Sequence, residues 1–155
     1  DYPFIFTNGV QASYVEVDPD TGFVKLLKHW AVEDCGRVLN PKLVDEQIRG
    51  AIVQGIGGAL FEECLYDEEG LMRNANMADY LVPMSGEMPD IEVAHVQTPT
   101  RSSQLGAKGA GEAGTAGAPA AVMNAINDAL APFKAQLWSQ PITPEKVLRA
   151  LGRVT

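Results

Sequence analysis

The residues best suited to chemistry lie between Leu105 and Ala121, in the stretch LGAKGAGEAGTAGAPAA. Five of its 17 residues are Gly and seven are Ala, so it presents bare backbone and few side chains. Its charged residues are Lys108 and Glu112. The spacing matches neither the P-loop, which needs Gly-Lys-Ser/Thr, nor an uninterrupted dinucleotide-binding glycine motif. The stretch therefore offers one carboxylate, Glu112, among glycines.

A helix follows directly and would place Glu112 just before its start. Apolar residues recur at helical spacing up to Leu130, which predicts a helix over residues 117–130. We expect Thr115 to cap this helix and Pro119 to lie in its first turn. Free N–H groups at a helix N-terminus favour an anion, either the Glu112 carboxylate or a ligand. A Gly/Ala linker with an incidental glutamate is an alternative of equal weight on these grounds alone.

A second helix is predicted over residues 43–65, with two unlike faces. Ile52, Ile56 and Leu60 recur every four residues, which indicates a core face. The other face carries amides and small residues: Gln47, Gly50, Gln54, Gly57 and Gly58. Glycine inside a helix costs about 1 kcal/mol relative to alanine, so we expect a close neighbour at the small face. Packing against another element is the favoured explanation, and a cofactor contacted by the two glutamine amides is the alternative.

The remaining segments predict a single α+β domain over residues 1–155. Residues 1–33 surround the turn sequence DPDTG and predict a β-hairpin-rich sheet. Residues 91–97 predict a further strand, after a loop over residues 83–90. Thr-Pro-Glu at the start of residues 143–151 favours a short final helix, with Thr as cap and Pro in the first position.

Composition excludes several classes of function. A net charge of −8 disfavours nucleic acid and anionic membranes as partners. No apolar run approaches the ~20 residues of a membrane-spanning helix. Cys35 and Cys64 form no metal-binding motif, so we expect reduced cytoplasmic thiols, with a disulfide as the alternative. His29 and His95 have no partner in the sequence, and we expect ordinary surface or half-buried residues.

Three motifs, in this order, resemble the C-terminal part of the molybdenum-binding large subunit of the xanthine oxidase family. They are VEDCGRVLNPKLVDEQIRGAIVQGIGGALFEE at residues 32–63, NANMADYLVPMSGEMPDIEV at 74–93 and GAKGAGEAGTAGAPAAVMNAINDAL at 106–130. The similarity extends over about residues 12–151. It is strongest to bacterial carbon monoxide dehydrogenase, nicotinate dehydrogenase, isoquinoline oxidoreductase and aldehyde oxidoreductase types. One motif alone would be weak evidence, but the three together are specific.

The resemblance implies roles for individual residues. Glu112, which ends the run Lys108-Gly109-Ala110-Gly111-Glu112, is implied to be the general base. Gln47 is implied to contact the pterin end of the cofactor. The loop made of Lys108, Gly109, Ala110 and Gly111 is implied to lie against the molybdenum site. Because burial among apolar groups makes a carboxylate a better base near neutral pH, we also expect Glu112 to be buried.

The resemblance also implies a reaction, cofactors and partners. The reaction is hydroxylation of an aldehyde or N-heterocycle carbon, with water as the oxygen source. The cofactor is molybdopterin in its cytosine dinucleotide form with molybdenum, and no protein side chain of this chain is expected to ligate the metal. Electrons would leave through iron–sulfur clusters and FAD on partner subunits or domains. The other partners would be the remainder of the large subunit and a small-molecule substrate, in the cytoplasm.

Large subunits of this family are several times longer than 155 residues, and this sequence does not begin with Met. We therefore expect a fragment, or one polypeptide of a split subunit, that shows no turnover alone. Two other hypotheses are a non-catalytic assembly module with the same fold and a nucleotide-binding α/β domain. The joint presence of Gln47 and Glu112 favours the enzyme over the first, and the missing P-loop pattern counts against the second.

Overall fold

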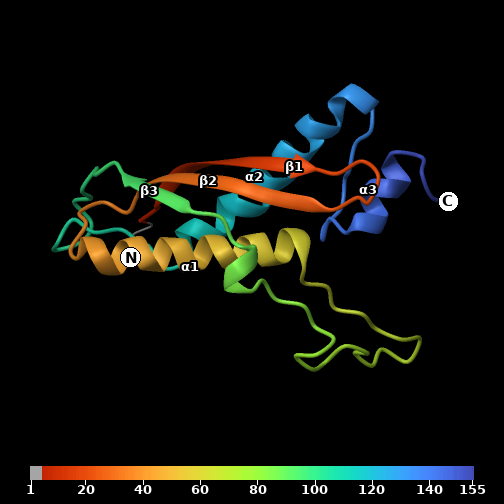
Figure 1. Cartoon of the computed structure of the whole chain (residues 1–155). Coiled ribbons are helices and arrows are strands. Elements are labelled where there is room, and N and C mark those ends of the chain that lie inside the picture. The colour runs from red at the N-terminus through yellow and green to blue at the C-terminus, as the bar shows by residue number, and fades with distance from the viewer. Residues whose placement is uncertain (1–4) are drawn as a thin grey trace.

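The computed structural model describes residues 5–155 as an α+β fold with one three-stranded sheet, as the sequence predicts. In Figure 1, α1 lies along the sheet, α2 runs obliquely to both, and α3 lies near the C-terminus. The first four residues of the predicted strand region lie outside the described residues. The elements are β1 (Asn8–Val17), β2 (Val24–Asp34), α1 (Pro41–Leu60), a 3-10 turn (Ser85–Glu87), β3 (Ile91–His95), α2 (Ala113–Leu130), a second 3-10 turn (Ala131–Phe133) and α3 (Pro144–Ala150).

Strands β1 and β2 form the predicted antiparallel hairpin. Its turn is stabilised by Asp18, whose carboxylate accepts a hydrogen bond from the Thr21 hydroxyl at 2.7 Å. Leu27 is an extra residue on β2, because the pairing with β1 shifts by one at this point. Such a bulge changes the alternation of side chains along a strand. As a result, Leu26 and His29 are both buried although three positions separate them.

Strand β3 lies parallel to β2, and α1 forms part of the connection between them. Parallel strands need a crossover of a dozen or more residues, which is usually a helix. The carboxyl ends of β2 and β3 therefore meet at the same edge of the sheet. Asp34 at the end of β2 and Thr98 just after β3 are brought together there by hydrogen bonds.

Helix α1 begins and ends earlier than the predicted range 43–65. Asn40 caps it by accepting a hydrogen bond from Leu43 N at 3.3 Å, and Pro41 takes the first position. The helix ends at Leu60, so the prediction for residues 61–65 is wrong. The amides of the next two residues both bind the Gly57 carbonyl, at 2.9 Å and 2.8 Å, and this closes the last turn.

Helix α2 begins at Ala113, four residues before the predicted start at 117. Thr115 is not its cap: this residue lies in the first turn, and its hydroxyl donates to Ala51 O of α1 at 2.9 Å. Pro119 lies inside the helix and not in its first turn. Because proline has no N–H, the carbonyl four residues earlier loses its helical donor. Glycine at position 55 lets α1 come close to that carbonyl: a Cβ added there would lie 3.0 Å from Thr115 O.

The core lies between the sheet and the two long helices. Ile52 and Ile56 are fully buried and Leu60 packs against the same cluster, which confirms the predicted core face of α1. Apolar residues at helical spacing on α2, such as Val122 and Ile126, complete this cluster. Further members come from the other elements: Leu26, Ala31, Ile91, Leu137, Ile142 and Val147.

Helix α3 begins as predicted. Thr143 caps it by accepting a hydrogen bond from Lys146 N at 3.3 Å, and Pro144 takes the first position. Between α1 and β3, residues 61–82 contain no helix or strand, and they extend away from the body of the molecule in Figure 1. The predicted loop at 83–90 contains only the single 3-10 turn.

Candidate functional site

The predicted loop, residues 108–112, runs directly into the first turn of α2. Glu112 occupies the N-cap position with φ −110° and ψ 5°, and its exposed side chain makes no capping hydrogen bond within the described chain. A Cβ added to Gly109 or Gly111 would meet no heavy atom of residues 5–155 within 4 Å. The loop therefore has accessible main-chain groups next to a carboxylate that makes no capping hydrogen bond.

The structure brings Gln47 to this loop. Its Nε2 donates a hydrogen bond to Gly111 O at 2.9 Å, across a separation of 64 residues. That carbonyl belongs to the same peptide group as the N–H of Glu112. The hydrogen bond thus fixes the orientation of the peptide that leads into the carboxylate-bearing residue.

The glycines of α1 differ in what they face. Gly55, which is not part of the predicted small face, packs against α2, with an added Cβ only 2.8 Å from Ala118 Cβ. Within the predicted face, Gly57 is buried, and an added Cβ there would meet Glu62 and Pro83, so packing explains that position. Gly50 and Gly58 face open space within the described residues, and Gln47 and Gln54 are both exposed. The outward part of this face is thus open to a ligand.

Lys108 anchors the loop instead of projecting from it. Its ammonium lies 3.1 Å from Asp34 Oδ2 and 2.7 Å from Thr98 Oγ1, and its side chain is only 11% exposed. Its N–H donates to Cys35 O at 2.7 Å. Lys108 therefore ties the loop to the edge where β2 and β3 end.

Asp34 is the acceptor at the centre of this anchor, and sequence reasoning missed it. Its carboxylate binds the Thr98 hydroxyl, the Thr98 amide at 3.1 Å and the Gly36 amide at 2.9 Å. The Thr98 hydroxyl above all, with the Gly36 amide and Lys108, holds the pKa of Asp34 well below its usual range. The sequence Asp-Cys-Gly at the end of a predicted strand is the signal that could have revealed it, because an Asp side chain often binds the amide two residues later.

His29 is fully buried, so the prediction of a surface or half-buried residue is wrong. Its Nε2 lies 3.1 Å from Gln11 Oε1 and its Nδ1 lies 2.9 Å from Ser13 Oγ. Burial lowers the pKa of His29 to about 4. His95 is half-buried as predicted and pairs with Asp45 of α1, with 2.6 Å between Nε2 and Oδ1.

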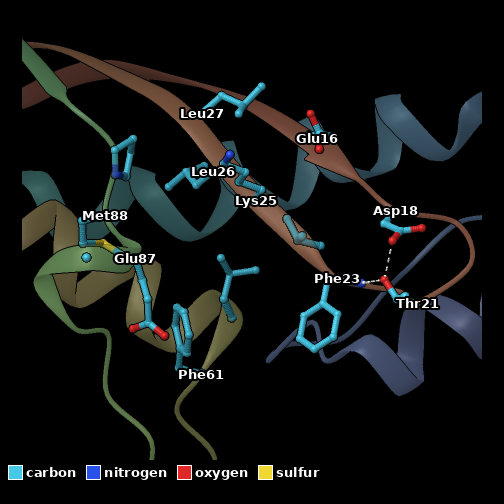
Figure 2. Close-up of a pocket in the computed structure, with 14 residues that line it drawn as sticks. Glu16, Asp18, Thr21, Phe23, Lys25, Leu26, Leu27, Phe61, Glu87 and Met88 are labelled. Carbon is cyan, nitrogen blue, oxygen red and sulfur yellow. Dashed lines mark hydrogen bonds between the residues drawn. The ribbon is translucent and has the colours of Figure 1, made fainter.

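The expected burial of Glu112 is not met by this chain. The glycines around Glu112 leave it open because they have no side chains to cover it, and its side chain is exposed within residues 5–155. A hollow of about 790 Å³ lies elsewhere, between the hairpin turn and the end of α1 (Figure 2). It is lined by apolar residues such as Phe23, Phe61 and Met88, and the predicted site residues are absent from its described lining.

A sequence model of the family described as molybdopterin cofactor-binding domain matches residues 1–89, more than half of the 155-residue chain. The chain belongs to this family. The match includes Gln47 and ends before the loop at residues 108–112.

Individual members of the family extend the similarity across the rest of the chain. A nicotine 6-hydroxylase large subunit of Paenarthrobacter nicotinovorans is 50% identical over 146 residues, which are 94% of this chain and 18% of that protein. A carbon monoxide dehydrogenase large chain of Afipia carboxidovorans is 34% identical over 130 residues, which are 84% of this chain and 16% of that protein. These relatives confirm the resemblance to molybdenum-binding large subunits.

The fold also matches a solved structure. Quinoline 2-oxidoreductase from Pseudomonas putida 86 superimposes with a TM-score of 0.86 and 43% identity, covering 89% of this chain and 18% of that one. This confirms the α+β cofactor-domain fold. The chain thus spans less than a fifth of the length of these relatives.

Residues 5–155 contain no cluster of three or more His, Cys, Asp or Glu that could bind a metal ion. Cys35 is buried and Cys64 exposed, and both are free thiols. Across the same residues no helix has the length and apolar character needed to span a membrane.

Proposed function

We propose that this chain forms the part of a molybdenum hydroxylase that holds the molybdopterin cofactor and supplies the general base. The observation that carries the proposal is the hydrogen bond from Gln47 to Gly111 O. This bond joins two segments to which the family resemblance assigns separate contacts with the cofactor, and both segments lie next to Glu112. Relatives named as a nicotine 6-hydroxylase, a carbon monoxide dehydrogenase and a quinoline 2-oxidoreductase support the class.

The residues of the loop suit an anionic cofactor. Gly109 and Gly111 leave their backbone open, so the N–H groups beside the start of α2 are available to phosphate oxygens. Gln47 uses one donor on Gly111 O, which leaves its Oε1 available to accept a hydrogen bond from the pterin. Lys108 contributes through its main chain, because its ammonium is bound to Asp34 and Thr98.

Glu112 would act as a proton acceptor. When bound, the cofactor supplies the redox centre that takes up the electrons of the oxidation. The Glu112 carboxylate accepts the proton released as the water-derived oxygen adds to the substrate carbon. The side chain is free for this role because it makes no capping hydrogen bond within the described residues. Burial of the carboxylate, which would improve it as a base, would come from the remainder of the large subunit and from the bound substrate.

The substrate we propose is a small N-heterocycle, with an aldehyde as the alternative. Two relatives that are 50% and 43% identical are named for nicotine and quinoline, which are both nitrogen heterocycles. We propose the cytosine dinucleotide form of the cofactor, with iron–sulfur clusters and FAD on partner subunits in the cytoplasm. A relative named as a subunit of a dehydrogenase complex supports such an assembly.

The test is Glu112→Gln in the assembled enzyme that carries this chain. This change keeps the shape of the side chain and removes the proton acceptor. General base catalysis contributes roughly 10²–10⁴-fold, so the rate of enzyme reduction by substrate should fall by about that factor. Rapid mixing measures this rate, and metal analysis should show a normal molybdenum content. A rate within about threefold of the parent would place the base elsewhere and leave Glu112 idle.

A further inference from the structure

Gln11 of β1 holds the first turn of α2, although 103 residues separate it from its partner there. Its Nε2 donates to Gly114 O at 2.9 Å and to Glu33 Oε1 at 3.1 Å. Glu33 is itself buried, at 2% exposure. Gly114 is the second residue of α2 and follows Glu112 by two positions. Gln11 therefore binds the turn from which Glu112 projects.

The orientation of the Gln11 amide is fixed by its two acceptors. Gly114 O and the Glu33 carboxylate can only accept hydrogen bonds, so Gln11 Nε2 faces them and Gln11 Oε1 faces His29. Because Gln11 Oε1 can only accept, the His29 Nε2 at 3.1 Å carries the hydrogen. His29 Nδ1 is then the acceptor for the Ser13 hydroxyl at 2.9 Å. Every group in this chain of hydrogen bonds has a defined role, which favours a single arrangement.

Gly117 of α2 makes room for Gln11. A Cβ added to Gly117 would lie 3.0 Å from Gln11 Cδ and 3.1 Å from its Nε2. Gly114 instead lies against α1, where an added Cβ would be 2.5 Å from Ile48 O. From α1, Ala51 O accepts the Thr115 hydroxyl at 2.9 Å. The first turn is thus held between β1 and α1.

We propose that Gln11 is a positioning residue for Glu112. Glu112 makes no side-chain hydrogen bond within the described chain, so its direction is set by the main chain of the turn that carries it. Gln11 fixes that turn from one side, and a shift of about 1 Å in a reacting group can lower a rate about 10²-fold. The inference rests on the proposed role of Glu112 as general base.

The experiment compares Gln11→Met with Gln140→Met in the assembled enzyme. Gln140 is a matched control, because its Nε2 also donates to a main-chain carbonyl of α2, Pro119 O, at 2.9 Å. In Gln11→Met, amide hydrogen exchange of residues 113–117 should rise about tenfold or more. The rate of enzyme reduction by substrate should fall about tenfold or more at unchanged molybdenum content. Gln140→Met should change neither quantity.

A double variant separates positioning from general destabilisation. If Gln11 acts through Glu112, Gln11→Met should lower the rate less than about twofold further in a Glu112→Gln background. Gly117→Ala is a second route that keeps every hydrogen-bonding group. Its methyl group should displace Gln11, increase exchange at residues 113–117 and lower the rate in the same direction.

The outcomes that would overturn the inference differ from those that would overturn the proposed function. Unchanged exchange at residues 113–117 in both Gln11→Met and Gly117→Ala would show that Gln11 does not hold the turn. Two results would overturn the positioning role alone. In the first, Glu112→Gln is slow but Gln11→Met reacts at the parental rate. In the second, Gln11→Met lowers the rate equally in the parent and in the Glu112→Gln enzyme. A parental rate in Glu112→Gln would show that Glu112 is not the general base, and Gln11 would then have no base to position.

Discussion

Around Glu112, side chains bind main-chain carbonyls at three points. Gln47 binds Gly111 O, Gln11 binds Gly114 O, and Thr115 binds Ala51 O of α1. The orientation of the loop is thus imposed from outside it. For this reason the loop can hold a defined conformation although it is rich in Gly and Ala. Its own main-chain groups stay accessible because few side chains cover them.

Because His29 is buried, the stability of the chain should depend on pH. Burial lowers its folded pKa to about 4, below the unfolded value of about 6.5. The unfolded chain therefore binds more protons between these values, and the free energy of unfolding falls as the pH falls through this window. The loss should be about 2 kcal/mol between pH 7 and pH 5.

The measurement is urea unfolding of the purified chain at several pH values. His29→Gln removes the titrating group and keeps a side chain that can both donate and accept. The difference between the two chains isolates His29 from the other titrating groups. Equal loss of stability in both chains from pH 7 to pH 5 would contradict the prediction.

The sequence predicts some of these residues and not others, for a physical reason. Glu112 and Gln47 stand out because they lie in specific motifs. Gln11 and Asp34 do not, since their partners are fixed by strand register and lie 103 and 64 residues away. The burial of His29 differs from the prediction because the bulge at Leu27, which turns His29 inward, has no clear signal in the sequence.

At the scale of elements, the contact between α1 and α2 decides where the site forms. Element types were predictable from hydrophobic periodicity, turn residues and caps. The start of α2 was not, because Thr115 and Pro119 suggest a later start when read locally, whereas its end at Leu130 agrees with the prediction. Contact with α1 changes the outcome: Ala51 O takes the Thr115 hydroxyl, and Gly55 approaches the carbonyl that Pro119 leaves without a donor. Tertiary packing here overrides local preference.

Two glycines of α1 should respond in opposite directions to alanine. In Gly55→Ala the new methyl group would meet Ala118 and Thr115, and stability should fall by about 1–3 kcal/mol. In Gly50→Ala the methyl group meets no described atom within 4 Å, and stability should rise by about 0.5–1 kcal/mol. Urea unfolding of the two variants measures both values. A stabilising Gly55→Ala would show that α1 and α2 are not in close contact.

At the scale of the whole molecule, α1 has a core face and an outward face that we propose for ligand binding. Its inward face, with Ile52 and Ile56, lies at the centre of the buried cluster. Its outward face carries Gln47 and Gln54, which are exposed. The two faces belong to one helix, so the core fixes the position of the loop through Gln47.

Substitutions on the two faces should therefore have separate effects. Ile56→Asp buries an unpaired charge, and assembled enzyme should not accumulate. Gln47→Ala removes the hydrogen bond to Gly111 O, and we expect a normal yield of enzyme with less molybdenum per protein. Enzyme yield and metal content are the two measurements. Loss of the fold in Gln47→Ala would assign this residue to structure alone.

The hydrogen bonds from Gln47 and Gln11 close loops of 64 and 103 residues. Contacts of such long range form only after the intervening chain has folded into place, because closing the loop costs entropy before the contact is made. During synthesis, both glutamines emerge long before the glycine loop that they bind. The proposed cofactor site should thus be among the last parts of this chain to form, and insertion of the cofactor should follow folding instead of guiding it.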